Sequence, residues 1–226
     1  MTFTQSKILS TNSSIKHGFI YMENQLNISD LSQQTGLVNI KTVKQVHGKD
    51  IVYFNDPSQF EENYEADAIV SDLAGFGVGV YTADCVPIIF IDDEKKTWGA
   101  IHAGWRGTLA GIAEKVCGYL IEKHECVAEN IKVAVGPCIE GGCYEIGEEI
   151  AKQFEDHFNN THIYLTRNEG TKYSLDLKKA NVEQLKKTGI TNIETIDICT
   201  KCDADYPSYR RDGKNAGRML SFIGIV

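Results

Sequence analysis

Three short segments of this chain each place a strong metal ligand beside a glycine or at the end of an apolar run. The segments QVHG, TADC and IHAGWRG supply His47, Cys85 and His102. Two imidazoles and one thiolate fill three corners of a tetrahedral Zn²⁺ site and leave the fourth open, as in catalytic zinc centres. The residues therefore predict a catalytic metal centre. Taken singly, each could instead be a hydrogen-bonded core histidine or an inert buried cysteine.

Arginine is rare in this chain and concentrated in two loops. Only five of the 23 basic residues are arginine, and the glycine-containing loops HAGWRG and YRRDGKNAGR hold four of them, Arg106, Arg210, Arg211 and Arg218. A planar guanidinium suits a phosphate or another oxyanion, and the helix expected directly after Gly107 would add backbone N–H groups. We expect Arg106, Arg210 and that helix N-terminus to hold an anion, and a structural role is the alternative for Arg211. Ion pairs with neighbouring aspartates are the alternative interpretation.

A proton-transfer group is harder to find. Asp84, beside Cys85, and Glu145 are the candidates, although Asp84 could simply cap a turn. The same atoms also allow a Cys–His hydrolase, with Cys85 as nucleophile and His47 or His102 as its base. Bound zinc would occupy the thiolate, so metal content separates the two chemistries. A protein that only binds a ligand, without turning it over, is the non-enzymatic alternative.

Four other cysteines could form a second metal site. Cys138 and Cys143 lie in PCIEGGC, and Cys199 and Cys202 lie in CTKC. A closed zinc knuckle uses two closely spaced pairs, and only CTKC has that spacing. A thioredoxin-like redox role for CTKC is weak, because no helix follows to lower the thiol pKa. The odd total of seven cysteines argues against a disulfide framework.

Apolar runs and helical spacing indicate an α/β sandwich with mixed sheets flanked by helices, as one domain over 1–226. Strands are expected at 50–54, 67–71, 76–82, 86–91, 98–102, 131–135, 162–165, 193–198 and 219–226. Helices are expected at 109–120, at 147–158, and from an N-cap at Asp176 to Lys187. The metal ligands would then lie at strand ends, held by a covered sheet. Four histidines outside the centre, including His17, are expected to be structural, capping or surface residues.

Composition excludes several classes of protein. The 226 residues have a formal net charge of -8, which disfavours binding to nucleic acid or to an anionic membrane surface. No apolar run approaches the ~20 residues that span a bilayer, and the first residues lack the apolar core of a signal peptide. We therefore expect a soluble cytoplasmic protein with reduced thiols. The oligomeric state cannot be read from the sequence.

Seven motifs in a fixed order resemble one family. They are QVHG, DAIVSD, GVGVYTADCVPIIF, IHAGWRGTLAGI, VGPCIEGGCYEIG, SLDLKKANVEQL and SYRRDGKNAGRM, and they span about residues 40 to 224. Together they resemble the laccase-domain or "multicopper polyphenol oxidoreductase" family, whose members are often described as purine nucleoside phosphorylases. Two departures stand out: IYMENQLNIS replaces the family's Arg, Gly-Gly and Ser stretch after HGF, and Glu140 lies inside the paired-cysteine loop.

The resemblance implies a metal bound by His47, Cys85 and His102. It further implies phosphorolysis of adenosine, inosine, guanosine or 5′-methylthioadenosine, with adenosine deamination as a side activity. Relatives are also described as polyphenol oxidases, and one branch as acting on peptidoglycan precursors. No motif reads a base edge, so Trp105, Tyr144 and Tyr209 are only candidates for stacking on a purine.

Counting ligands restricts the redox and deaminase alternatives. A blue copper centre would use two of the six histidines, and the remaining four are too few for a trinuclear cluster. A single Cu²⁺ on the same three ligands remains an alternative to Zn²⁺. The common zinc deaminase signature, H-x-E with P-C-x-x-C, is only imitated, because Gly104 replaces the glutamate after His102. Deamination would need another acid or base.

Overall fold

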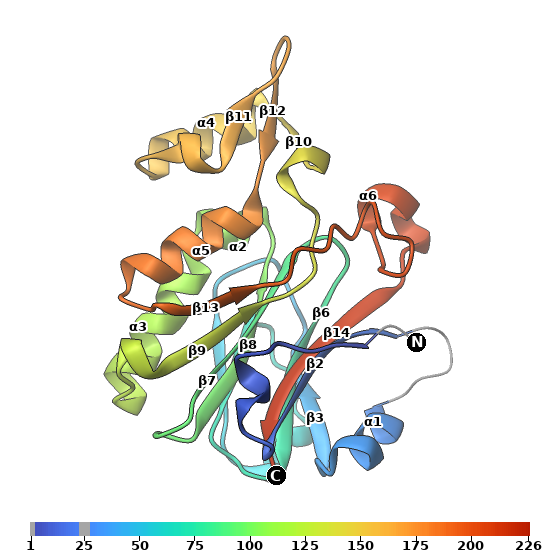
Figure 1. Ribbon diagram of the computed structural model, residues 1–226, viewed down its shortest axis with the longest axis vertical. Helices are drawn as coiled ribbons and strands as arrows, with labels where there is room; N and C mark the ends of the chain where they lie inside the picture. The colour runs from blue at the N-terminus through green and yellow to red at the C-terminus, as the bar shows by residue number, and fades with distance from the viewer. Residues whose placement is uncertain (1–2, 23–27) are drawn as a thin grey trace.

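The computed structural model describes residues 3–22 and 28–226, and two mixed β-sheets form its centre (Figure 1). The six-stranded sheet runs in the order β13 (Asn192–Thr195), β9 (Ile131–Val135), β7 (Val86–Asp92), β8 (Thr97–Ala103), β5 (Ala68–Ser71) and β4 (Ile51–Phe54). The five-stranded sheet runs β1 (Phe3–Thr4), β2 (Ile15–Met22), β14 (Arg218–Ile225), β6 (Phe76–Thr82) and β3 (Asn39–Thr42). Each sheet contains both parallel and antiparallel pairs.

Strand β7 shows why the central strands read as continuous apolar runs. All seven of its residues are buried. Ile88 and Phe90 point to the core under the helices, whereas Ile89 and Ile91 point to the core between the two sheets. A strand covered on both faces has no wet side, so the period-2 alternation of a half-exposed strand is lost. Three layers result: a sheet, a second sheet and a layer of helices.

Helices cover the outer face of the six-stranded sheet (Figure 1). They are α2 (Trp105–Leu109), α3 (Ile112–His124) and α5 (Leu177–Lys187). A smaller sheet of β10 (Glu145–Gly147), β12 (Lys172–Leu175) and β11 (Leu165–Arg167) carries α4 (Glu148–His157) at one end of the molecule. The remaining helices are α1 (Ile28–Thr35) beside β3 and α6 (Tyr209–Asp212).

The predicted α/β class with mixed sheets is confirmed, but two strand predictions are wrong in their bounds. Residues 161–163 form a 3₁₀ turn, and the strand expected at 162–165 begins only at Leu165. The strand expected at 193–198 ends at Thr195. In both places an isoleucine or tyrosine beside a loop extended the apolar pattern beyond the hydrogen-bonded ladder. The short strands β3, β10 and β12 lacked a pattern long enough to recognise.

The helix predicted at 109–120 is in fact two helices. Helix α2 begins at Trp105 behind the N-cap Gly104, and Gly111 separates it from α3 with a left-handed backbone, φ +75°. Glycine adopts this conformation without a steric penalty. The expected helix N-terminus after Gly107 is therefore wrong, because Gly107 lies inside α2. With only five residues, α2 offers no extended dipole for an anion.

Polar side chains of α5 attach α2 to the helical layer. The amide of Asn181 donates to the Thr108 hydroxyl at 2.9 Å, and the amide of Gln184 donates to the Thr108 carbonyl at 2.7 Å. Asp176 caps α5 as predicted, accepting the N–H of Lys179. This buried polar contact explains why the predicted apolar face of α5 is thin. It also fixes α2, which carries residues of the site described next.

Candidate metal centre and active site

The structure brings His47, Cys85 and His102 together from three separate segments. His47 follows β3, Cys85 joins β6 to β7, and His102 lies near the end of β8. Their potential ligand atoms all lie within 4.8 Å of one another. The two imidazole rings stand edge to face with centroids 4.8 Å apart. His102 is buried, Cys85 half-buried and His47 exposed, so the cluster leads from the core to an open surface.

Asp67, at the start of β5, holds both histidine segments and is fully buried. Its carboxylate accepts the Nδ1–H of His102 at 2.7 Å. The same carboxylate accepts the backbone N–H of His47 at 2.9 Å and of Gly48 at 2.6 Å. Because a carboxylate only accepts, Nδ1 of His102 must donate, and Nε2 is left to face Cys85. A carboxylate behind a histidine is the usual support of a metal-binding imidazole.

Two tight backbone features bring the three side chains into contact. A Cβ at Gly104 would lie 2.9 Å from Nδ1 of His47 and 3.2 Å from the Cys85 sulfur, so only glycine fits between them. His47 and Asp84 both have positive φ, +60° and +84°. Non-glycine residues at positive φ are uncommon, and such strain concentrates at functional sites.

Near neutral pH the cluster favours a thiolate at Cys85 and a protonated ring at His102, so a metal that binds here would displace the His102 proton. Burial alone would raise the pKa of the Cys85 thiol, but hydrogen bonds and positive charge from His102 and His47 lower it to about 7. Burial opposes the charged form of His102, yet Asp67 and Cys85 raise its pKa to about 9. Thiolate is the form of cysteine that binds metal. The donor set, two imidazoles and a thiolate with a supporting carboxylate, therefore fits Zn²⁺ and also Cu²⁺.

A cavity of about 770 Å³ opens over this cluster. That volume lies within the range of small-molecule sites. Its wall includes the three cluster residues and the aromatic side chains of Tyr81, Trp105, Tyr144 and Tyr209. All three residues proposed from the sequence as stacking partners thus line the cavity. None of the lining residues comes from the described part of the segment after HGF, and residues 23–27 of that segment lie outside the described residues.

Three of the four loop arginines also line the cavity. Arg106, Arg210 and Arg218 are exposed, and each contributes to its wall. The guanidinium of Arg106 lies 4.2 Å from the centre of the Trp105 ring. That of Arg210 lies 4.9 Å from the centre of the Tyr144 ring and donates to the Glu145 carbonyl at 3.0 Å.

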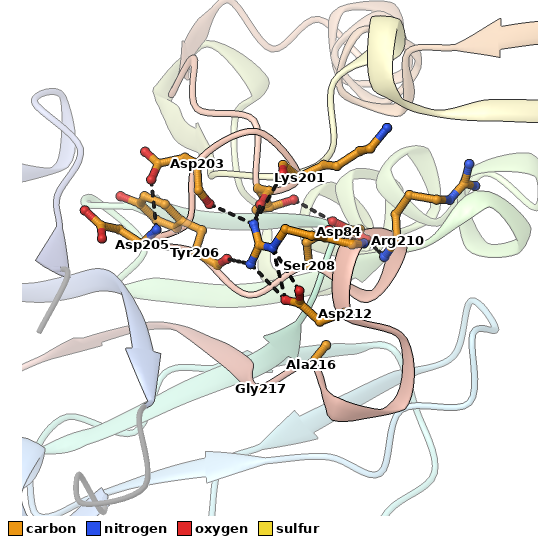
Figure 2. A network of polar contacts seen from close by, with 12 residues as sticks. Asp84, Lys201, Asp203, Asp205, Tyr206, Ser208, Arg210, Asp212, Ala216 and Gly217 are labelled. Atoms are coloured by element: carbon orange, nitrogen blue, oxygen red, sulfur yellow. Dashed lines mark hydrogen bonds and ion pairs between the residues drawn. The ribbon is translucent and has the colours of Figure 1, made fainter.

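Arg211 is a structural residue, as the sequence allowed. Its guanidinium donates to the carbonyls of Thr200, Asp203 and Tyr206 at 2.8 to 3.1 Å and pairs with Asp212. Figure 2 shows Asp203, Tyr206 and Asp212 gathered around this network, with dashed lines marking their bonds. These bonds therefore fix the conformation of the loop from Thr200 to Tyr206 that precedes α6. Glu145 is not among the residues that line the cavity: its carbonyl accepts from Arg210, and its carboxylate pairs with Lys172 at 3.5 Å.

Asp84 lines the cavity, but both its oxygens are already engaged. One accepts the Thr200 hydroxyl at 2.7 Å and the other the backbone N–H of Arg210 at 2.6 Å. These bonds tie the segment of Cys85 to the arginine loop. Asp84 therefore joins two distant segments, whereas the sequence offered proton transfer or a cap on its own turn.

Sequence reasoning missed Asp67 and Thr82. Asp67 begins the motif DAIVSD, and an acidic residue that opens a fully buried strand was the available signal. Thr82 ends β6 and is 2% exposed, and its hydroxyl has no hydrogen-bond partner within the described chain. Because Thr82 lines the cavity, a bound ligand is the natural partner of that hydroxyl.

Comparison with known proteins identifies the family. The profile of the family described as multi-copper polyphenol oxidoreductase laccase matches residues 5–226. The chain belongs to this family. A purine nucleoside phosphorylase of Clostridium acetobutylicum is 37% identical over 201 residues, covering 87% of this chain and 81% of that protein. An adenosine deaminase from an unknown prokaryotic organism is 39% identical over 164 residues, covering 70% and 61%.

The fold of this laccase-family chain also matches a solved relative. The crystal structure of the hypothetical protein YfiH from Bacillus licheniformis superposes with a TM-score of 0.84 at 26% identity, covering 94% of this chain and 93% of the other. Relatives with named activities make this a family of enzymes, and the His and Cys clusters suit a metal-binding family. Among the described helices, none is both long and apolar enough to cross a membrane.

Proposed function

We propose that this chain is a metal-dependent purine nucleoside phosphorylase. Adenosine, inosine, guanosine and 5′-methylthioadenosine are its proposed substrates, with Zn²⁺ as the metal. The observation that carries the proposal is the composition of one cavity wall: aromatic faces for a base, three guanidiniums for phosphate, and the His47, Cys85 and His102 cluster at its inner end. The names of the relatives support the same reaction class.

His47, Cys85 and His102 would hold the metal. When bound, zinc supplies a Lewis acid at the open position of an incomplete tetrahedron. Asp67 contributes by fixing the ring of His102 and the backbone at His47. It thereby sets the direction of both imidazoles before any ligand arrives.

Phosphate would bind at the exposed arginines. Arg106 and Arg210 are its proposed partners, and Arg218 is near enough along the same wall to contribute. Stacking on Trp105 and Tyr144 holds the first two guanidiniums in fixed planes, which lowers the entropy lost when they bind an oxyanion. Asp84 would act as a positioning residue, through the backbone of Arg210.

The aromatic residues would bind the purine. Trp105, Tyr144 and Tyr209 provide faces on which a planar base can stack. The Thr82 hydroxyl, which lacks a partner among the described residues, would hydrogen-bond a hydroxyl or ring nitrogen of the nucleoside.

In phosphorolysis a phosphate oxygen forms a bond to C1′ of the sugar. The bond from C1′ to N9 breaks, its electron pair leaves with the purine, and the purine takes up one proton. Holding phosphate and nucleoside against each other converts a bimolecular encounter into an oriented reaction within one site. The arginines spread the negative charge of phosphate as the sugar carbon becomes electron-deficient.

One chromatographic experiment tests this assignment. Purified enzyme is incubated with adenosine, with and without phosphate. Adenine and ribose 1-phosphate formed only with phosphate are expected, together with slower formation of inosine, the deamination product. Both products should disappear in His102→Ala.

The other outcomes identify the alternatives. Phosphate-independent inosine alone would mean a deaminase. Untouched adenosine, with oxidation of a phenol only after Cu²⁺ loading, would favour a single-copper oxidase. Hydrolysis of an ester or peptide by metal-free protein, abolished in Cys85→Ala, would favour the Cys–His hydrolase, and turnover of a cell-wall precursor would favour the peptidoglycan branch. Each of these results contradicts the proposal if phosphate-dependent formation of adenine and ribose 1-phosphate is also absent.

A further inference from the structure

A second sulfur cluster lies outside the site described above. Cys143, Cys199 and Cys202 come from two loops, and their sulfurs all lie within 4.8 Å of one another. The sulfurs of Cys143 and Cys202 are 3.2 Å apart although the residues are separated by 59 positions. Cys138, grouped with them from the sequence, lies in the hydrophobic core instead and is fully buried. The four-cysteine hypothesis is therefore wrong in one member, and three thiols converge.

The spacing of these sulfurs suits a tetrahedral thiolate centre. With zinc–sulfur bonds of about 2.3 Å, two sulfurs on one ion lie about 3.8 Å apart. The sulfurs of Cys143 and Cys202 are 3.2 Å apart, and all three sulfurs lie within 4.8 Å of one another, so small side-chain shifts would bring them to that spacing. Cys143 and Cys199 are half-buried and Cys202 is exposed, so packing of a core does not explain the convergence. Exposed thiols without a partner are a liability that proteins ordinarily avoid.

The backbone around Cys199 is arranged to stabilise a thiolate. Burial alone would raise the pKa of the Cys199 thiol, but the backbone N–H groups of Glu140, Cys202 and Lys201 lower it. Lys201 and Cys202 belong to the turn of CTKC, which is closed by the N–H of Cys202 and of Asp203 donating to the Cys199 carbonyl at 3.1 and 3.0 Å. In a C-x-x-C turn, backbone N–H groups of the third and fourth residues face the sulfur of the first cysteine. They can bond the sulfur lone pairs that a bound cation leaves free.

Main-chain bonds already hold the two loops together. The N–H of Thr200 donates to the Cys138 carbonyl at 3.1 Å, and that of Cys138 to the Ile198 carbonyl at 3.3 Å. The loops therefore meet before any ion binds, so little ordering entropy opposes binding. We propose that Cys143, Cys199 and Cys202 form a second metal site, which takes a soft divalent cation such as Zn²⁺ on three thiolates with the fourth position open to solvent.

The second centre would brace the wall of the substrate cavity. Cys143 directly precedes Tyr144, and the loop of Cys199 and Cys202 leads to Arg210. Arg210 spans the two segments by stacking on Tyr144 and donating to Glu145. An ion joining the loops behind this contact would limit their relative motion. Binding releases the protons of the thiols to solvent, and no oxidant or reductant takes part.

Metal titration in a Cys85→Ala background tests the second site without the first. Reduced, metal-free full-length protein is titrated with Co²⁺ under anaerobic conditions, and sulfur-to-cobalt charge-transfer absorption counts the thiolate ligands. One Co²⁺ per chain with the intensity of three thiolates is expected. In Cys85→Ala/Cys202→Ser the intensity should fall by about a third and the affinity by at least about 10-fold. Cys143→Ser in the same background repeats the test on the other loop.

The control is Cys85→Ala/Cys126→Ala, which removes a buried cysteine that belongs to neither cluster. It should bind Co²⁺ like its parent. Absence of sulfur-to-cobalt absorption in Cys85→Ala, or binding unchanged by both serine variants, would overturn the proposal. So would alkylation of only four of the six remaining thiols when Cys85→Ala is unfolded and alkylated without reductant, because a disulfide would then occupy the cluster. None of these readouts depends on turnover of a nucleoside.

Discussion

The two cysteine-containing clusters are built in opposite ways. The first, of His47, Cys85 and His102, lies at the ends of core strands, with the buried Asp67 behind it. The second, of three cysteines, lies on surface loops, where backbone N–H groups of Glu140, Cys202 and Lys201 lower the pKa of the Cys199 thiol. A buried carboxylate fixes ligand direction and ligand charge at the first cluster. The second relies on a local turn, so it is expected to exchange metal readily and to act on stability.

The largest difference should follow removal of one sulfur from the first cluster. Cys85→Ala removes one ligand of three, and we expect one metal ion per chain to be lost and phosphorolysis to fall by more than about 10²-fold. Elemental analysis and the phosphate-dependent adenosine assay measure the two effects. Cys126→Ala is the matched control. Equal zinc in Cys85→Ala and the parent would remove Cys85 from the centre.

Substitution of two arginines tests whether a guanidinium in the cavity wall binds phosphate directly. Arg106→Ala should raise KM for phosphate, or lower kcat, by a factor on the order of 10², as for loss of an oxyanion donor. Arg167→Ala is the control, because Arg167 packs on Tyr173 outside the cavity lining. Steady-state kinetics at varied phosphate provide the measurement. An unchanged phosphate dependence would refute the assignment of Arg106.

Substitution of the buried Asp67 carboxylate tests whether metal affinity depends on it at the first cluster but not at the cysteine cluster. Asp67→Asn keeps the shape of the side chain but replaces one acceptor by a donor that faces the N–H groups of His102, His47 and Gly48. Metal affinity at the first cluster should fall about 10- to 100-fold, as for loss of other groups behind metal ligands. Competition with a chromophoric chelator measures it. If the cysteine cluster weakened equally, the two clusters would not be independent.

At the cysteine cluster we expect zinc binding to raise the melting temperature of the protein. In the Cys85→Ala background, free zinc at 100-fold its dissociation constant should stabilise the fold by about 2.7 kcal/mol. For a chain of this length that corresponds to a rise in Tm of about 5 to 11 °C. Calorimetry with and without zinc measures the shift. The added Cys202→Ser substitution should remove most of it, and an equal shift in both proteins would contradict the proposed ligands.

The smallest effect concerns a buried histidine that belongs to neither cluster. Burial lowers the pKa of His17 below its usual 6.5, although backbone hydrogen bonds partly oppose this. Below pH 6.5 the unfolded chain takes up a proton that folded His17 does not, so the free energy of unfolding falls as the pH drops toward the lowered pKa. The contribution cannot exceed about 1.4 kcal/mol per pH unit.

Urea unfolding between pH 5 and 7 detects this slope, and His17→Gln should reduce it. The contrast with His102 is instructive, because both rings are nearly excluded from solvent. Asp67 and Cys85 reverse the effect of burial at His102, whereas at His17 the backbone hydrogen bonds and the charge of Glu194 do not outweigh burial. A slope unaffected by His17→Gln would assign the acid sensitivity to other groups.

Local sequence was enough to predict the elements with strong patterns. The apolar run of β7 and the Asp176 cap of α5 depend on nearest neighbours in the chain, and both predictions are confirmed. The helix predicted at 109–120 is present as α3 from Ile112, but its start was wrong, because the left-handed Gly111 separates α3 from α2 without changing the apolar spacing. The cytoplasmic location, the bound metal and the nucleoside substrates stay predictions.

For the site, the sequence by itself determined the chemical inventory: two imidazoles, a thiolate, scarce arginines placed in two loops, and a C-x-x-C turn. Those are properties of residue type and short spacing. Tertiary structure alone decided that Asp67 supports both histidines, that Asp84 holds the loop of Arg210, and that Cys143 joins CTKC while Cys138 does not. Such contacts join segments tens of residues apart. The pairing of strands and loops that creates them is set by burial of the whole core, which no short stretch of sequence specifies.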